Sequence, residues 1–165
     1  MLTGLSNRYH LEATLQEMPA QAKQAKHSVA VLFIDLDGFK EVNNSFGHSK
    51  GDAFLKIMAQ RLRSLVTTDD TIARIGGDEF VLVLGKIKEL SSVVERAQNI
   101  LETVNQEHTF MDAKFFLGAS IGISLFPKHD SDIEALINLA DKAMYKVKES
   151  TKNSFLFYEE RMGKN

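Results

Sequence analysis

The chain contains 165 residues, of which 44% are hydrophobic and 25% charged, and its formal net charge at pH 7 is -2. This length is typical of one globular domain, and the near-neutral charge argues against a general basic surface that binds nucleic acid. The absence of cysteine excludes disulfides and thiolate metal sites, as is usual in a reducing cytoplasm. The longest apolar run, Val29 to Ile34, is too short to span a membrane, and the first residues lack a secretory pattern.

The N-terminal third predicts a broken helix followed by a buried strand. Ser6 and Asn7 can cap a helix that Pro19 interrupts or restarts before Lys26. The continuous apolar run 29–34 then predicts a central strand whose carboxyl end opens into a loop, where α/β proteins commonly bind ligands.

The remaining elements alternate between helical and extended periodicity. Amphipathic helices are predicted over 53–65, 90–104 and 133–147, and strands over 71–75, 79–84, 115–126 and 155–158. The Gly76-Gly77 connection is too short for a crossover, so it must join antiparallel neighbours and disfavours a strictly parallel doubly wound fold. The order predicts an α/β fold with a mixed, mostly antiparallel central sheet, flanked by helices that pack mainly on one face.

The segment Gly76 to Phe80 is the most informative part of the chain. Its two glycines suit the positive φ angles of a tight hairpin turn, and the turn presents Asp78 and Glu79 with only Arg74 as a basic neighbour. Neighbouring carboxylates repel one another unless a cation relieves the repulsion, so the segment indicates a metal site. Taken alone, it is equally compatible with a hairpin that carries solvated acids at its tip.

Asp35 supplies a candidate partner for these acids. If the strand that ends at Asp35 lies beside the hairpin, three carboxylates come close together, and Mg²⁺ prefers such hard oxygen ligands. The alternative role for Asp35 is capping of a helix that begins near Gly38.

Six segments carry a resemblance to one family, and together they extend over essentially the whole chain. They are Leu2–Arg8, Phe33–Lys40, Asn43–His48 with Gly51 and Asp52, Arg74–Phe80, Ser120–Ser124, and Ala140–Tyr145 with Lys148. In this order the sequence resembles the catalytic GGDEF domain of diguanylate cyclases, which is far more specific than a single short motif.

The resemblance implies a fold similar to the palm of polymerases and class III nucleotide cyclases. It also implies a nucleotidyltransferase for signalling, which condenses two GTP molecules into cyclic di-GMP and two pyrophosphates by metal-assisted attack of a 3′-hydroxyl on an α-phosphate. The implied metal, Mg²⁺ or Mn²⁺, would be held by Asp35, the carbonyl of Leu36, Asp78 and Glu79. Asp78 is the candidate proton acceptor, and Glu79 is a second ligand or base.

The resemblance further implies a phosphate site in which Gly38, Phe39 and Lys40 begin a short helix whose free N–H groups favour an anion. Lys148 and Lys152 match two basic positions that contact phosphate in the family. The alternatives are a solvated surface role for Lys40 and interaction of the other two lysines with a helix C-terminus. The sequence Thr151-Lys152-Asn153 departs from the usual Gly-Arg-Asn and reduces the support for Lys152.

Guanine recognition is predicted for Asp52, because a carboxylate can accept hydrogen bonds from both donors on the guanine edge. Asn43 matches the family residue that pairs with the remaining guanine groups, and His48 would touch the substrate or brace the loop. The alternative for Asn43 and Asp52 is helix or turn capping, and a lone histidine is more often structural.

The product-inhibition site of the family is degenerate here. Its Arg-x-x-Asp motif corresponds to 67–70, where Asp70 is present but Thr67 stands in place of the arginine. Because bidentate recognition by that guanidinium is lost, weak or absent feedback inhibition through this site is predicted.

The organisation of the whole protein follows from the same resemblance. Residues 1–165 are predicted to be a single catalytic domain excised from a longer chain with an N-terminal regulatory part, in the cytoplasm or as the cytoplasmic part of a membrane-anchored sensor. The symmetric product requires two sites that face one another, so turnover needs a homodimer, whereas the isolated domain should be mostly monomeric. The alternative function is a non-catalytic GTP-binding regulatory module.

Overall fold

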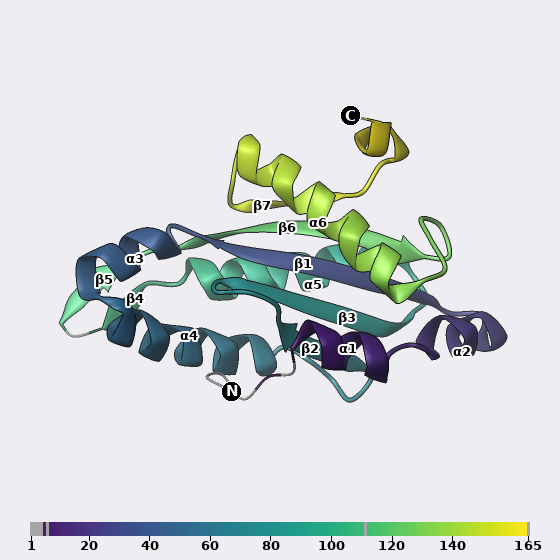
Figure 1. The fold of residues 1–165 in the computed structure, drawn as a ribbon, viewed down its shortest axis with the longest axis horizontal. Coiled ribbons are helices and arrows are strands. Elements are labelled where there is room, and N and C mark those ends of the chain that lie inside the picture. The colour runs from purple at the N-terminus through teal and green to yellow at the C-terminus, as the bar shows by residue number, and fades with distance from the viewer. Residues whose placement is uncertain (1–4, 6, 111, 165) are drawn as a thin grey trace.

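A computed structural model describes residues 5, 7–110 and 112–164, and its centre is a five-stranded sheet with the order β2-β3-β1-β6-β7 (Figure 1). Every neighbouring pair is antiparallel except β6 and β7, which run parallel. The predicted mixed, mostly antiparallel sheet is therefore confirmed. The strands are β1 (Ser28–Asp37), β2 (Asp70–Arg74), β3 (Glu79–Ile87), β6 (Gly118–Phe126) and β7 (Ser154–Phe157).

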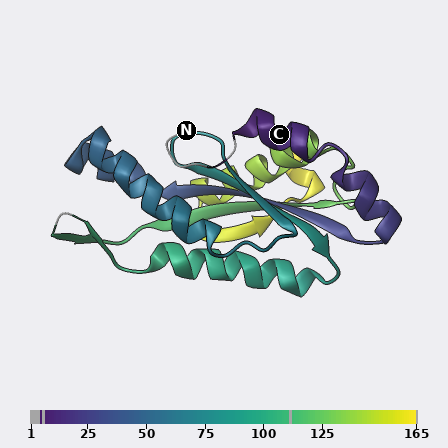
Figure 2. The same cartoon turned by 90° about the horizontal axis from the view of Figure 1, so that it is seen from below.

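Helices cover both faces of the sheet, which corrects the expectation that they pack mainly on one face (Figure 2). The helices are α1 (Arg8–Thr14), α2 (Met18–Ala25), α3 (Phe39–Phe46), α4 (His48–Arg63), α5 (Leu90–Asn105) and α6 (Ile133–Glu149), followed by the 3₁₀ helix η1 (Glu160–Lys164). Helices α3, α4 and α5 pack on one face, and α1, α2 and α6 pack on the other.

The central strand β1 explains why two helical layers form. Successive side chains of a strand point to opposite faces, and β1 is apolar at nearly every position. Ala30, Leu32 and Ile34 belong to the core beneath α4 and α5. Val31 and Phe33 belong to the core beneath α1 and α6. A strand that is buried on both faces needs helices or other elements on both faces. The continuous apolar run of β1 therefore indicates two helical layers, whereas the order of the elements suggested one.

The local signals at the N-terminus are confirmed where the structure describes them. The side chain of Asn7 accepts a hydrogen bond from the backbone N–H of His10 at 2.8 Å and so caps α1, while Ser6 lies outside the described residues. Pro19 lies in the first turn of α2, where its missing N–H costs no helical hydrogen bond.

The strand predicted over 115–126 is two strands in the structure. Its first residue belongs to β5 (Ala113–Phe115), which pairs with β4 (His108–Phe110) in a separate two-stranded sheet, and β6 begins at Gly118. An apolar run does not mark where one strand ends and the next begins, so periodicity alone joined them.

Helix α6 packs unusually closely on β6 because of Gly122. A Cβ atom at this position would lie 1.9 Å from the carbonyl oxygen of Ala140 and 2.2 Å from the backbone nitrogen of Met144. Only glycine permits that approach, and it fixes the height of α6 above the sheet. None of the helices in the described residues is long and apolar enough to cross a membrane.

Candidate active site

The ends of β1 and β3 bring acidic residues from two distant segments together. Asp35 and Glu79 are Cα partners in the antiparallel pairing of these strands. One residue further on, the backbone N–H of Leu36 donates to the carbonyl oxygen of Asp78 at 3.1 Å. The expected proximity of the first strand and the acidic hairpin is therefore present. Asp35 lies within β1, so it does not cap the helix that begins after Gly38.

The Gly-Gly connection has a different geometry from the predicted one. Among the described glycines, positive φ occurs at Gly38 and Gly47, and not at Gly76 or Gly77. A Cβ atom at Gly76 would lie 2.7 Å from Oε1 of Glu79, but this oxygen is the far end of a flexible side chain that can move aside, so space alone does not require glycine there. The Nε and Nη2 atoms of Arg74 donate to the carbonyl oxygen of Gly77 at 3.2 and 3.1 Å and brace the loop.

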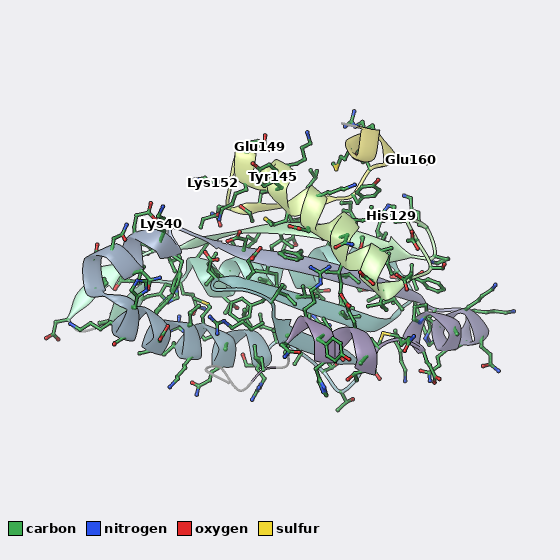
Figure 3. All side chains as sticks on the ribbon, viewed as in Figure 1. Lys40, His129, Tyr145, Glu149, Lys152 and Glu160 are labelled. Atoms are coloured by element: carbon green, nitrogen blue, oxygen red, sulfur yellow. The ribbon has the colours of Figure 1, made fainter. Side chains whose placement is uncertain are left out.

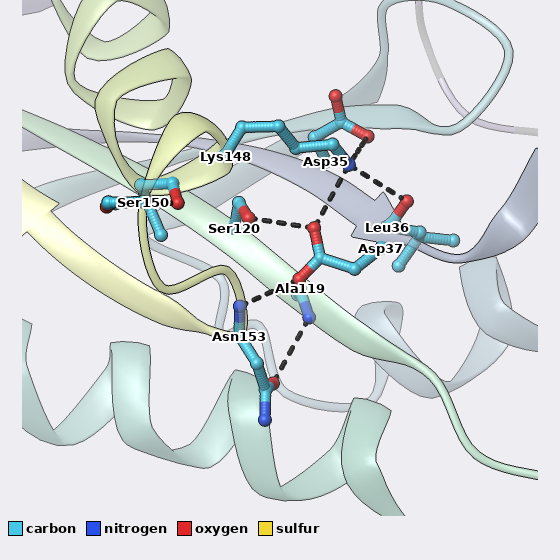
Figure 4. A network of polar contacts seen from close by, with 9 residues as sticks. Asp35, Leu36, Asp37, Ala119, Ser120, Lys148, Ser150 and Asn153 are labelled. Carbon is cyan, nitrogen blue, oxygen red and sulfur yellow. Dashed lines mark hydrogen bonds and ion pairs between the residues drawn. The ribbon is translucent and has the colours of Figure 1, made fainter.

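A lysine from α6 reaches into this acidic centre (Figure 4). The Nζ atom of Lys148 donates to Oδ1 of Asp35 at 3.1 Å, to the carbonyl oxygen of Leu36 at 3.3 Å and to Oδ1 of Asp37 at 3.0 Å. The side chain thus pairs with acids of β1, and it also lies in the last turn of α6, where a positive charge interacts favourably with the helix C-terminus. Burial by itself lowers the pKa of Lys148, but the hydrogen bonds and charges of Asp37 and Asp35 outweigh burial and raise that pKa.

The acids retain unfavourable electrostatics despite this lysine. Burial, and then the charge of Asp78, raise the pKa of Asp35 from its ordinary 3.8 to about 6, against the opposing effect of Lys148. Burial, followed by the charges of Asp141 and Asp78, also raises the pKa of Glu79. The single ammonium group of Lys148 therefore does not balance the negative charge of these carboxylates.

A second cation, Arg8 of α1, acts on the acids through its charge. Its Nε atom donates to Oε1 of Glu12 at 2.9 Å and its Nη2 atom to Oδ1 of Asn138 at 2.6 Å. Its charge lowers the pKa of Asp141 and of Glu79, although burial keeps both pKa values above their ordinary range. Arg8 and Asp141 belong to the motifs noted in the sequence, but their electrostatic influence on Glu79 could not be read there.

The geometry allows a test of the predicted metal ligands. Within the described residues, no three His, Cys, Asp or Glu side chains form a ready-made metal cluster, so Asp35, Asp78 and Glu79 do not converge on one point. The Lys148 ammonium contacts Asp35 and the Leu36 carbonyl, two of the four predicted ligands, so this position accepts a cation. Mg²⁺ usually takes one or two carboxylates, with phosphate and water completing its shell, and these residues fit that requirement.

The predicted guanine residues lie on the helices that follow β1. Oδ1 of Asn43 in α3 is buried and has no hydrogen-bond partner in the described structure. It packs against Gly51 of α4, where a Cβ atom would lie 1.7 Å from it. Asp52 follows Gly51 and is exposed, and the N-cap of α4 is Gly47, so neither Asn43 nor Asp52 is a cap. A buried amide oxygen without a partner is uncommon, and the exposed carboxylate of Asp52 can accept hydrogen bonds from a ligand.

The predicted phosphate residues occupy the start of α3 and the end of α6. Gly38 is the N-cap of α3 with a φ of 85°, the side chain of Phe39 is buried, and Lys40 is exposed. Lys40 and Lys152 lie toward the end of the molecule where β1 ends and α3 begins (Figure 3). His48, the first residue of α4, is exposed.

Asp70 is part of a structural cluster away from these acids. Its Oδ2 atom accepts hydrogen bonds from Nη2 of Arg96 at 2.6 Å and from the backbone N–H and hydroxyl of Thr67 at 2.9 and 3.0 Å. Arg96 also donates to the carbonyl oxygen of Leu65 at 2.8 Å. The sequence motif draws attention to Asp70, but Arg96 of α5 belongs to no motif, so this ion pair could not be predicted from the sequence.

Comparisons with known proteins agree with this geometry. The fold and the site define an α/β domain in which a mixed sheet carries acidic residues on its two central antiparallel strands. A family model described as "Diguanylate cyclase, GGDEF domain" matches residues 1–154. The chain therefore belongs to the GGDEF domain family.

Individual relatives show the same relationship. The bifunctional diguanylate cyclase/cyclic di-GMP phosphodiesterase MucR of Pseudomonas aeruginosa is 39% identical over 99% of this chain, which spans 24% of MucR. The diguanylate cyclase TpbB of Pseudomonas aeruginosa is 36% identical over 93% of this chain, which spans 35% of TpbB. The solved GGDEF domain of TpbB matches with a TM-score of 0.93 and 34% identity, over 98% of this chain and 95% of that one. The chain thus corresponds to one part of these longer relatives.

Proposed function

We propose that this chain is the catalytic domain of a diguanylate cyclase, which condenses two GTP molecules into cyclic di-GMP and two pyrophosphates. The observation that carries the proposal is the pairing of Asp35 with Glu79 across β1 and β3, at a position where the Lys148 ammonium already bridges Asp35 and the Leu36 carbonyl. Membership of the GGDEF family supports the same reaction.

The reaction forms a bond between a 3′-oxygen and an α-phosphorus and breaks the bond to pyrophosphate. Asp35, the Leu36 carbonyl, Asp78 and Glu79 would hold Mg²⁺ or Mn²⁺. When bound, such a metal neutralises charge around the α-phosphate and the leaving group and favours the 3′-alkoxide. Asp78 accepts the proton of the attacking hydroxyl, and Glu79 is the alternative base.

Lys148 has a defined task in this proposal. Its ammonium group can keep its bond to Asp37 while it turns a donor from Asp35 to a phosphate oxygen, because a lysine ammonium carries three rotatable donors. The backbone N–H groups at Gly38 and Phe39, together with Lys40 and Lys152, would bind the remaining phosphate oxygens.

Base selection is assigned to the two helices beside the phosphate site. Asp52 accepts from both donors of the guanine edge, the unpaired Oδ1 of Asn43 gains a partner, and His48 contacts the nucleotide or braces this loop. A pocket built from these acceptors rejects adenine, because the pattern of donors and acceptors is different.

Turnover requires a second copy of the domain, since each site would hold one GTP and the product is symmetric. We expect the isolated domain to be mostly monomeric, so its rate per subunit should rise with protein concentration. A rate per subunit that stays constant over a hundredfold dilution would argue against the dimeric mechanism.

The decisive experiment is incubation of the protein at high concentration with GTP and Mg²⁺, followed by chromatography of the products. Cyclic di-GMP and pyrophosphate are expected, and Asp78→Ala should abolish them without lowering the melting temperature. Bound but unchanged GTP would instead favour the non-catalytic regulatory module. An absence of both product and bound GTP would contradict the proposal.

A further inference from the structure

Asp37 is a buried carboxylate that the proposed reaction does not use directly. It is the last residue of β1, only 9% exposed, and its i,i+2 spacing from Asp35 places both acids on the same face of the strand. A buried carboxylate is costly unless every oxygen finds a donor, so its partners indicate what it is there to hold.

The two oxygens of Asp37 bind groups from α6, from β6 and from the turn that precedes β7 (Figure 4). Oδ1 accepts from Nζ of Lys148 at 3.0 Å and from the hydroxyl of Ser120 in β6 at 2.8 Å. Oδ2 accepts from the backbone N–H of Asn153 at 2.8 Å. This one side chain therefore ties the end of α6 and the start of β7 to the end of β1.

The segment held by Oδ2 has an unusual backbone. Lys152 and Asn153 both have positive φ values, 53° and 45°, and this conformation is strained for a residue with a side chain. Two further bonds fix the turn, one from the Lys152 N–H to the Val147 carbonyl at 2.9 Å and one from the Ala119 N–H to Oδ1 of Asn153 at 3.3 Å. The direction in which Lys152 leaves the backbone thus depends on this network.

From these contacts we infer that Asp37 is a positioning residue that holds Lys148 and the Lys152-Asn153 turn in place to receive the triphosphate of GTP. The inference rests on the proposed function, because it assigns the two lysines to phosphate. Asp37 lies behind Lys148 and contacts no substrate atom in this assignment. Substitution of Asp37 should therefore weaken binding of the phosphates and leave binding of the base unchanged.

The substitution Asp37→Asn tests this role with little change in volume. An amide has one acceptor oxygen, so its NH₂ group must face either the Lys148 ammonium or the Asn153 N–H, and one of the two cannot be bound. The affinity for a GTP analogue that resists cleavage at the α-phosphate should fall by about tenfold or more, since charge-assisted bonds are the stronger ones. The affinity for guanosine should stay within about twofold.

A double-mutant cycle with Lys148→Met separates positioning from general damage. If Asp37 acts largely through Lys148, the effect of Asp37→Asn on analogue affinity should shrink to about threefold or less in the Lys148→Met background. Independent effects would multiply instead.

Strand β6 supplies a matched pair of serines as a control. Ser120 and Ser124 are both fully buried, but Ser120 donates to Asp37 whereas Ser124 donates to the Leu136 carbonyl at 2.6 Å. Ser120→Ala should weaken analogue binding by about two- to fivefold, because Oδ1 loses one of its two donors. Ser124→Ala should leave analogue binding unchanged.

The outcomes are distinguishable. Equal analogue affinity of Asp37→Asn and the wild type, or a parallel loss of guanosine affinity, would overturn the positioning role and leave the proposed function intact. A wild-type protein that bound neither ligand would overturn the proposed function and the inference together. Melting temperatures measured for each variant identify any that fail to fold, and the Ser120 and Ser124 pair then decides the matter.

Discussion

The carboxylates of Asp70 and Asp35 lie at opposite ends of the region formed by β1, β2 and β3, and their surroundings differ in kind. Asp70, whose side chain is 4% exposed, receives a guanidinium and two donors from Thr67. Asp35 faces Asp78 and Glu79 and shares one ammonium with Asp37. The carboxylate of Asp70 is matched by a cation of its own, whereas that of Asp35 shares its cation and faces other acids.

The difference separates a structural acid from a functional one. Removing one partner of a buried, hydrogen-bonded ion pair strongly destabilises the folded protein, because the other charge is left buried and unpaired. Partly buried acids whose charges are incompletely balanced lower stability, and such groups are common at sites where a ligand supplies the missing charge. Asp70 thus joins the start of β2 to the loop before it and to α5, whereas the surroundings of Asp35 and Glu79 are those expected of the proposed cation site.

The largest expected effect is on turnover. Asp35→Asn should reduce the rate of cyclic di-GMP formation on the order of a thousandfold, because a ligand of the predicted metal is lost. Its free energy of unfolding at pH 7 should not fall, because the neutral amide removes repulsion. Rates by product chromatography and stability by urea unfolding check both statements, and a variant that was active or markedly unstable would break the distinction.

Asp70→Ala should show the reverse pattern. It leaves Arg96 and two Thr67 donors without their partner, so the free energy of unfolding should fall by about 2–4 kcal/mol. Turnover well below the melting temperature should stay within a few-fold of the wild type. The same variant tests feedback, since tight cyclic di-GMP binding that Asp70→Ala abolished would contradict the predicted loss of the inhibition site.

The pH dependence of stability should distinguish the two acids next. The pKa of Asp35 is raised from 3.8 to about 6, so the folded state binds more protons than the unfolded state between these values. Stability should therefore fall as pH rises from about 4 to 6, by up to about 3 kcal/mol at 1.36 kcal/mol per pKa unit. Urea unfolding of Asp35→Asn should lack this part of the pH dependence, and Asp70→Ala should retain it.

The smallest expected effect is stabilisation by the metal alone. Mg²⁺ at ten times its dissociation constant should raise the free energy of unfolding by about 1.4 kcal/mol. Thermal unfolding with Mg²⁺ should show this shift in the wild type and in Asp70→Ala, but not in Asp35→Asn. A shift of equal size in all three proteins would place the metal elsewhere.

Much of the fold could be predicted because its signals are local. The apolar run at 29–34 is a strand buried on both sides, and the periodicity over 90–104 and 133–147 gives α5 and α6 almost to their ends. The short Gly76-Gly77 connection correctly required antiparallel neighbours. The predicted positive φ angles of Gly76 and Gly77 were wrong, because a tight turn can also be made with negative φ angles and a glycine pair is compatible with both.

The candidate site was predictable in its residue types but not in its contacts. The proximity of Asp35 to the hairpin followed from strand order, whereas the bonds from Lys148 to Asp35 and Asp37 join residues 113 and 111 positions apart. Arg96 reaches Asp70 from a helix that follows it by 26 positions. Such pairs depend on how the helices pack on the sheet, and local sequence patterns do not predict that packing.

Gly122 has a mechanical consequence for the ammonium of Lys148. A helix that rests on side chains can rise or roll as rotamers change, but α6 meets β6 backbone to backbone, and close-packed backbone is nearly incompressible. The distance from α6 to the sheet is therefore fixed, and the Lys148 side chain spans this distance to reach the acids of β1. A change that lifted α6, such as a larger residue in place of Gly122, would draw the ammonium group away from Asp35 and Asp37.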